Sequence, residues 1–347
     1  MRKHLVVICL WAALALQGQA LAQPGFPKSD YPSLSLTDLA QILRPNDAQG
    51  MALGLTGAAY REGLFATYTN PAGLRLDDLT VAYSHIPAAG SFSGMLFNQE
   101  AFALGLPVSE SITLGAHFFN LNLGTIELTD RFGNAVGEER IGVREAQLSG
   151  AARLGFKQSM IALGLNTKYL EIYLPGLNAH SFLVDAGMRY RLDTEKARYA
   201  LAVSVSNLGE ELKHGMYSLG APIRLLRSGL SAGTVPRPEA NVGVMATLEY
   251  QRSLRDEERY SRWNHLGLGV ELQFLNHLYS RLGYNFDFAD VSERAKIDGF
   301  TYGLGFHTPR KIKVGVPIDL SLHYGKGLTD YRQLDTNVIT IALGLEL

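Results

Sequence analysis

From Leu79 to the C-terminus, apolar residues alternate with small or polar ones, which is the period of a β-strand and not of a helix. The last segment is the clearest case. Its residues Ile339, Ile341, Leu343, Leu345 and Leu347 fall on one face, and Val338, Thr340, Ala342, Gly344 and Glu346 fall on the other. Strands of a membrane barrel present an aliphatic face of this kind to lipid and the other face to a crowded interior. The alternation therefore points to a β-fold.

The sequence after residue 22 contains no long apolar run, so no helix of that part is expected to cross a bilayer. A chain without such helices either stays outside the membrane or crosses it as a closed barrel, because lipid does not tolerate open strand edges. The charges nearly balance, with 32 Lys and Arg against 33 Asp and Glu. Because there is no basic surplus to neutralise phosphates, we expect no nucleic-acid partner.

The first 22 residues have the features of an export signal. Arg2 and Lys3 form a charged start, an apolar stretch follows, and Ala20-Leu21-Ala22 is typical of a cleavage site. Removal of 1–22 would also remove Cys9, the only cysteine of the chain, so the mature protein would have no disulfide and no thiol nucleophile. An exported chain without cysteine is suited to the envelope of a bacterium with two membranes.

The alternation predicts fourteen strands, at 79–86, 92–107, 111–125, 142–156, 158–172, 180–192, 198–208, 222–233, 239–250, 261–274, 277–286, 299–307, 317–325 and 335–347. Long and short connections alternate between them, for example 126–141 and then 157, as in barrels whose two ends both lie in the periplasm. A secreted soluble β-protein would also alternate, but its strands are usually five or six residues long. We therefore expect an all-β fold, a 14-stranded antiparallel transmembrane β-barrel over 79–347 in the cell outer membrane, in contact with its lipid.

Residues 23–78 do not alternate. Ser35 precedes an apolar pattern that runs to Leu43, which predicts one short capped amphipathic helix. A tract rich in Gly and Ala follows at 50–59, and Asn70-Pro71-Ala72-Gly73-Leu74 reads as a turn that permits close approach to a wall. A fourteen-stranded barrel is wide enough to need filling. We therefore expect 23–78 to be a small N-terminal plug, with the motif Asn70 to Leu74 inside the lumen.

Several short motifs resemble the PorV/PorQ family, within the wider group of fatty-acid-transporter-like outer-membrane barrels. They are 45–54 followed by Asn70-Pro71-Ala72-Gly73-Leu74, then Ser206-Asn207-Leu208-Gly209, Pro222-Ile223-Arg224, 265–271 and 281–285. The resemblance implies a plugged fourteen-stranded barrel. For some members it also implies a part in type IX secretion, whereas other relatives import hydrophobic molecules. The sequence departs from the family pattern at Gln49, where an Arg commonly follows the Asp-Ala pair.

No pattern in the chain predicts catalysis. Gly229-Leu230-Ser231-Ala232-Gly233 matches a hydrolase nucleophile elbow, but the residues after it begin no helix, as that elbow requires. The histidines lack metal-ligand spacing, and no phosphate-binding glycine loop precedes a helix. We therefore expect a protein that is not an enzyme, with no catalytic residues, no metal and no cofactor.

Two functions remain open, with a membrane hydrolase as a weaker third. The leading one is a structural or interaction component of a protein secretion or surface-attachment machinery, whose partners would be machinery or cargo proteins. The alternative is a transporter for hydrophobic small molecules such as fatty acids. Transport needs a continuous apolar path from the outer loops past the plug, and a scaffold does not. The candidates for such a path are Leu219, Ile223, Leu225 and Leu226.

One ion pair is predicted inside the lumen. Alternation places Glu271 and Arg281 on the inward faces of consecutive strands joined by a turn at 275–276. A tight turn there would set the two residues opposite each other, within reach of a cross-strand ion pair. The alternative is two independent solvated charges.

Overall fold

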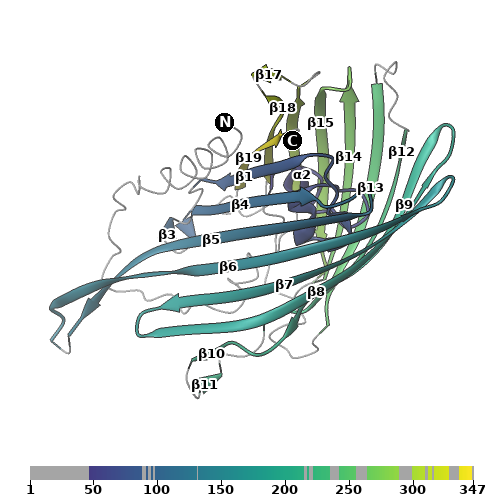
Figure 1. The fold of residues 1–347 in the computed structure, drawn as a ribbon. Coiled ribbons are helices and arrows are strands. Elements are labelled where there is room, and N and C mark those ends of the chain that lie inside the picture. The colour runs from purple at the N-terminus through teal and green to yellow at the C-terminus, as the bar shows by residue number, and fades with distance from the viewer. Residues whose placement is uncertain are drawn as a thin grey trace.

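The computed structural model describes residues 47–87, 91–92, 95–96, 98–130, 132–214, 217–218, 222–234, 242–254, 264–288, 299–308, 312–314, 316–327 and 336–345. The expected signal at 1–22 and the expected helix at 35–43 lie outside these residues. Most of the described chain forms one antiparallel sheet that curls until its first strand pairs with its last (Figure 1). The expected 14-stranded barrel is confirmed.

The fourteen strands of the barrel follow one another around the ring. They are β1 (Leu79–Ile86), β4 (Asn98–Pro107), β5 (Ile112–Thr129), β6 (Ala135–Gly155), β7 (Ser159–Leu174), β8 (Leu177–Asp193), β9 (Ala197–Gly209), β12 (Leu225–Thr234), β13 (Val242–Ser253), β14 (Asn264–Phe274), β15 (Leu278–Asp287), β16 (Gly299–His307), β18 (Val316–Gly327) and β19 (Thr336–Leu345). Shorter pieces stand in the connections: β2 (Ser91–Phe92), β3 (Met95–Leu96), β10 (Lys213–His214), β11 (Tyr217–Ser218) and β17 (Ile312–Val314). The ring closes where Leu79 of β1 faces Leu345 of β19.

The two faces of the strands differ as the alternation predicts. Large apolar side chains such as Phe300 and Leu304 are 60% and 62% exposed on the outside. Their neighbours Thr301 and Gly303 point inward, and Thr301 is buried. A barrel with an apolar exterior and buried polar side chains inside is built to stand in lipid, where its exterior needs no hydrogen bonds.

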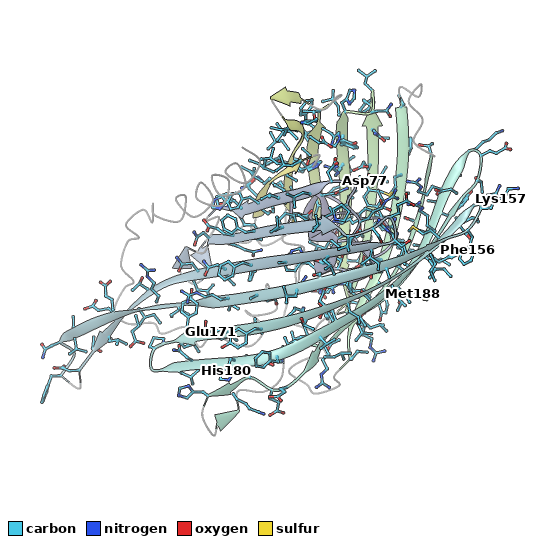
Figure 2. The ribbon with its side chains drawn as sticks, in the orientation of Figure 1. Asp77, Phe156, Lys157, Glu171, His180 and Met188 are labelled. Atoms are coloured by element: carbon cyan, nitrogen blue, oxygen red, sulfur yellow. The ribbon has the colours of Figure 1, made fainter. Side chains whose placement is uncertain are left out.

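The barrel has two distinct ends. The short-turn end carries the connections from β4 to β5, from β6 to β7 and from β8 to β9, and the described chain both enters and leaves the ring there. Phe156 and Lys157 mark this end in Figure 2, whereas Glu171 and His180 lie toward the opposite end. The strands are uneven in length, since β6 has 21 residues and β1 has 8.

The expected loop at 126–141 is wrong. The strands β5 and β6 continue through it as a paired ribbon, with Thr125 facing Arg140, and leave only a tight turn near Asp130. This ribbon extends beyond the shorter strands in Figure 1. Its residues Glu138 and Glu139 are not apolar, because a strand that extends past the lipid needs no apolar face.

Residues 47–78, called here the N-terminal segment, precede β1. They form α2 (Ala48–Ala52), η3 (Leu64–Tyr68) and η4 (Pro71–Gly73), joined by tight turns. The side chain of Asp47 caps α2 by accepting a hydrogen bond from the N–H of Gly50. The segment packs on inward-facing residues of β6, β7, β8, β15, β16, β18 and β19. Figure 1 shows α2 behind the strands of the front wall.

No helix in the described part of the chain is both long and apolar enough to cross a membrane.

Candidate functional site

The N-terminal segment approaches the barrel wall where the wall carries glycine. Gly267, Gly269 and Gly283 on β14 and β15 lie beneath Leu53 and Gly54, and a Cβ at any of the three would collide with that backbone. These glycines belong to two of the motifs, 265–271 and 281–285, that carry the family resemblance. In this chain the motifs therefore have a packing role, because they let backbone lie directly on backbone.

The side chain of Asn70 joins the segment to itself and to the wall. Its amide donates to the carbonyl oxygens of Ala58, at 3.0 Å, and of Met188 on β8, at 3.2 Å. Its Oδ1 accepts the N–H of Ala72 at 2.9 Å, which caps η4. Asn70 is completely buried, so an apolar residue there would leave several backbone groups without partners.

The other residues of the predicted motif lie against the same wall. Pro71 and Ala72 cover Gly164 of β7, and the Asn70 side chain covers Gly187 of β8. Gly73 fits against the carbonyl of Arg61, and Leu74 is fully buried. Fixed turn geometry and small residues at this site allow the segment to sit against two strands at once.

The carboxylate of Glu249 on β13 is the main anchor of the segment backbone. Its Oε2 accepts the N–H groups of Gly57 and Ala58, both at 2.7 Å. The neighbouring Gln251 donates to the carbonyl of Leu55 at 2.9 Å, and the Arg227 guanidinium lies 3.7 Å from Glu249. Sequence reasoning missed Glu249, because its partners precede it by about two hundred residues and leave no local pattern.

The predicted pair of Glu271 and Arg281 is brought together in the lumen. The two residues are register partners on β14 and β15, and Arg281 Nε donates to Glu271 Oε2 at 2.6 Å. The same carboxylate accepts the hydroxyl of Tyr60, and Arg281 Nη1 lies 3.1 Å from Nδ1 of His323. Burial and the nearby Glu271 raise the pKa of Tyr60 well above its ordinary value, so Tyr60 stays a donor. The pair therefore also fastens the segment.

A second ionic contact lies toward the short-turn end. Glu62 of the segment is 3.0 Å from Arg189 and 3.0 Å from Arg191, both on β8, and 3.5 Å from Arg75. Burial alone would raise the pKa of Glu62, but these guanidiniums together hold it below its ordinary range. Glu62 is therefore a carboxylate at neutral pH and holds the segment to the wall.

A cavity of about 460 Å³ opens below the segment. Its lining includes Tyr60, Glu271, Arg281, Arg198 and His323, so its wall is largely polar. Two of the contacts that hold the segment, Tyr60 with Glu271 and Glu62 with Arg189, border this cavity.

The motif residue Asn207 has a structural role near the end of β9. It adopts a left-handed conformation, with φ 62°, beside a break in the pairing of β8 and β9. Its N–H donates to Asp185 at 2.8 Å, and its side chain accepts from Lys168 Nζ at 2.7 Å. Lys168 and Asp185 form a buried ion pair at 2.9 Å. The break in pairing thus frees the N–H of Asn207 to bind the buried carboxylate of Asp185.

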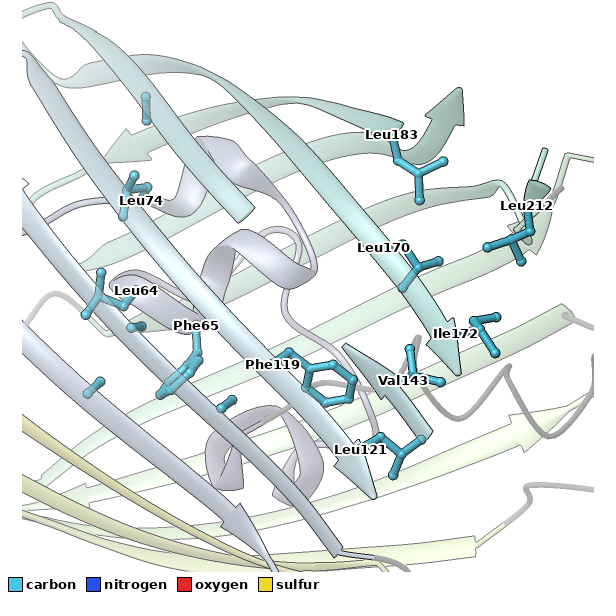
Figure 3. Close-up of a cluster of buried hydrophobic side chains, with 14 of the residues drawn as sticks. Leu64, Phe65, Leu74, Phe119, Leu121, Val143, Leu170, Ile172, Leu183 and Leu212 are labelled. Atoms are coloured by element: carbon cyan, nitrogen blue, oxygen red, sulfur yellow. The ribbon is translucent and has the colours of Figure 1, made fainter. Parts of the chain in front are cut away.

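An apolar cluster covers one side of the lumen (Figure 3). Its buried members come from the segment and from β1 and β4 to β8, with one residue after β9. They are Leu64, Phe65, Leu74, Leu76, Ala82, Ala101, Ala103, Phe119, Leu121, Val143, Ala151, Leu170, Ile172, Ala179, Leu183 and Leu212. Leu76 lies at the short-turn end, whereas Ile172 and Ala179 lie near the opposite turn of β7 and β8. The cluster, called here the apolar stripe, therefore reaches from one end of the lumen to the other past the segment. On β6 and β7 buried polar residues such as Gln147 and Lys168 lie between its members.

The stripe is not where the sequence predicted it. Of the four candidates, Leu225 is buried and Ile223 and Leu226 are half-buried, but none belongs to the stripe. Leu219 lies outside the described residues. The signal that was available is the run of inward apolar positions on β5 to β8, such as Phe119 and Leu170, which interrupts the expected small-or-polar inner face.

The nucleophile elbow that the sequence pattern at 229–233 resembles does not form. Ser231 lies in the middle of β12, which runs straight through 229–233 and pairs with β9 and β13, so the strand-turn-helix of a nucleophile elbow is absent there. Within the same described part, no three His, Cys, Asp or Glu residues gather where they could hold a metal ion.

Solved structures share this architecture. The toluene transporter TodX of P. putida superposes with a TM-score of 0.51 at 12% identity, over 87% of this chain and 98% of that one. A FadL homologue from Pseudomonas aeruginosa follows with a TM-score of 0.49 at 10% identity, over 87% and 98% of the two chains. No protein-family model and no curated protein matches the chain. The likeness to TodX shows a shared fold, that of an outer-membrane barrel.

Proposed function

We propose that the protein transports hydrophobic small molecules, such as fatty acids, across the outer membrane. The observation that carries the proposal is the apolar stripe, which runs along the inner wall from near the turn of β7 and β8 to Leu76. A scaffold does not need an apolar cluster of this length among the buried polar side chains of a lumen. The fold shared with the toluene transporter TodX is consistent with the proposal.

The stripe would act by burying the surface of an apolar molecule, and no chemical reaction is needed. An apolar molecule that leaves water for such a wall gains roughly 25 cal/mol for each Å² of surface buried, so a chain of contacts guides it inward. The segment contributes Leu64, Phe65 and Leu74 to the stripe, and its residues Tyr60 and Glu62 line the cavity of about 460 Å³. A molecule that reaches these three residues passes on only when the segment shifts.

The anchors of the segment suit such a shift. Glu249, Glu271 and Glu62 hold it through hydrogen bonds and ion pairs, and none of these is a covalent link. Each contact contributes on the order of 1 to 3 kcal/mol, so several can break together at a cost that ligand binding offsets.

Uptake by cells tests the proposal. The chain is expressed in a Gram-negative host that lacks its own transporter of this kind, and uptake of a radiolabelled long-chain fatty acid and of toluene is measured. Leu121→Asn and Leu170→Asn place a polar group in the stripe. Val338→Asn is the matched control, because Val338 is equally buried but lies in a separate apolar cluster on β19.

We expect uptake of at least one probe with the unmodified protein, and a loss of about tenfold or more with each stripe variant at equal amounts of folded barrel. The control variant should retain uptake. Transport that is absent from the unmodified protein, or equally reduced in all three variants, would contradict the proposal.

The part in type IX secretion that the PorV/PorQ resemblance implies remains a prediction, as does membership of that family. The ribbon formed by β5 and β6 beyond the barrel is the feature that could meet a partner protein. A pull-down in detergent from native outer membranes, with identification of proteins and lipids that co-purify, tests it. Stoichiometric secretion components would favour the scaffold function, and lipid without protein would favour transport.

A further inference from the structure

A second cavity, of about 560 Å³, lies at the short-turn end of the barrel, where the chain leaves the segment for β1. Three arginines line it, Arg75, Arg153 and Arg191. Leu76, Pro107 and Met160 supply its apolar wall. The hydrophobic path proposed above makes no use of these arginines.

Arg153 on β6 is the unusual member. It points inward and is 9% exposed. Its Nη2 donates only to neutral groups, the carbonyl of Glu110 at 3.1 Å and the hydroxyl of Thr113 at 3.4 Å. Its Nη1 is buried without a hydrogen-bond partner, and no carboxylate among the described residues makes an ion pair with it.

The other arginines at this end already have acidic partners. Arg191 lies 3.0 Å from Glu62 and 3.4 Å from Asp193, and Arg75 lies 3.5 Å from Glu62. Arg189 shares Glu62 as well, and Arg198 lies 2.7 Å from Asp193.

The remaining carboxylates of the cavity stand at its rim. Asp77 is 88% exposed and lies 4.0 Å from Arg75, and Glu110 is exposed. Solvent screens both, so neither offsets the charge of Arg153 as a direct ion pair would.

A buried guanidinium without a direct ion pair is costly, since the charge has lost much of its water and touches no carboxylate in return. We propose that this cavity is a binding site for an oxyanion, a carboxylate or a phosphate group, held against Arg153. The planar guanidinium offers paired N–H groups that match two oxygens of such an anion. Arg75 and Arg191 add positive potential, and Leu76, Pro107 and Met160 would contact an apolar part of the same molecule.

The site does not depend on what the barrel transports. Its chemistry fits two sources, a small free anion or the anionic head group of an amphiphile. The apolar wall distinguishes them, because only an amphiphile gains from contact with it.

Binding to the full chain in non-ionic detergent, at neutral pH and fixed ionic strength, tests the proposal by calorimetry and by thermal unfolding. The probes are inorganic phosphate, octanoate, and dihexanoyl phosphatidylglycerol, with dihexanoyl phosphatidylcholine as the zwitterionic comparison. The variants are Arg153→Gln and Arg153→Lys. Arg144→Gln is the matched control, because Arg144 lies on the same strand but outside the cavity, over the ring of Tyr173.

We expect millimolar or tighter binding of at least one anionic probe, accompanied by a rise in the unfolding temperature. Arg153→Gln should weaken it at least about tenfold, Arg153→Lys should weaken it less, and Arg144→Gln should bind as the unmodified protein does. If phosphate binds as tightly as octanoate and phosphatidylglycerol, the ligand of the cavity is a small free anion. If octanoate or phosphatidylglycerol binds and phosphate does not, the ligand is an amphiphile.

Without any anion, Arg153→Gln should unfold at the same or a higher temperature than the unmodified protein, because it removes an uncompensated charge. This measurement distinguishes a loss of binding from a loss of folding. If Arg153→Gln does not assemble, Arg153→Lys is used in its place. The proposal is overturned if no anionic probe binds at millimolar concentration, or if anions bind equally well without Arg153.

Discussion

Arg281 Nε lies 2.6 Å from Oε2 of Glu271, directly across the pair of strands β14 and β15 and on the inside of the barrel. Both side chains are buried, and the hydroxyl of Tyr60 reaches the same carboxylate from the N-terminal segment. A contact between two strands of the wall is thereby also a contact between the wall and the segment.

The first prediction concerns this pair. Glu271→Gln and Arg281→Gln should each destabilise the barrel by about 3 kcal/mol, because each leaves one buried charge unpaired. The double variant should cost less than the sum of the two, with a coupling of about 1 kcal/mol or more. Unfolding from detergent micelles measures all three, and additive effects would show that the pair contributes no coupling.

A second prediction concerns the glycines beneath the turn at Asn70. Gly164→Ala and Gly187→Ala each place a Cβ against the turn, so they should displace it and cost about 1 to 3 kcal/mol. Faster proteolysis of the segment, at unchanged heat-modifiable mobility on gels, is the expected readout. Gly155→Ala, where a Cβ would meet nothing within 4 Å, is the control. Equal proteolysis in the three variants would place the turn away from these strands.

A third prediction concerns the segment as a plug. A chain without residues 23–74 should form a barrel that conducts ions more freely in planar bilayers, because α2, η3 and η4 then no longer occupy the lumen. The full chain recorded under the same conditions is the reference. Equal conductance would mean that these residues do not obstruct the lumen.

The fourth prediction is a pH dependence of the segment's attachment. The pKa of Glu62 is lower in the folded protein than the ordinary value of about 4.3, so its contribution to stability is complete above that value and is lost as the pH falls through the folded pKa. Protease sensitivity of the segment should therefore rise in acid, below about pH 4. In Glu62→Gln the segment should be sensitive at neutral pH as well and should respond less to acid. An identical acid response in both proteins would exclude Glu62 as its cause.

The barrel could be predicted from the sequence because lipid imposes a rule on each strand separately. An outward position such as Ile339 must be apolar wherever the strand crosses the membrane, so a local pattern reveals it. The pair of Glu271 and Arg281 could be predicted for the same reason, since alternation and one tight turn determine the register of the two strands.

The other contacts of the lumen obey no such local rule. Glu249 binds Gly57 across nearly two hundred residues, and Arg189 pairs with Glu62, which lies 127 residues earlier in the chain. The strands β5 and β6 beyond the membrane carry charges because water surrounds them, so their pairing has no apolar signature. Phe119 belongs to the stripe and directly follows Phe118, which faces outward. Two consecutive apolar residues do not show the alternation that would reveal which of them points inward.

The pairing of β1 with β19 has a consequence for how the protein is made. The last strand to be synthesised completes the ring, so no shorter nascent chain can form a barrel without leaving two open strand edges. Contacts between residues so far apart in the chain close slowly, and exposed edges in the meantime invite aggregation. The ring is therefore expected to close only once β19 is available, and the loss of that strand should abolish assembly outright rather than merely weaken it.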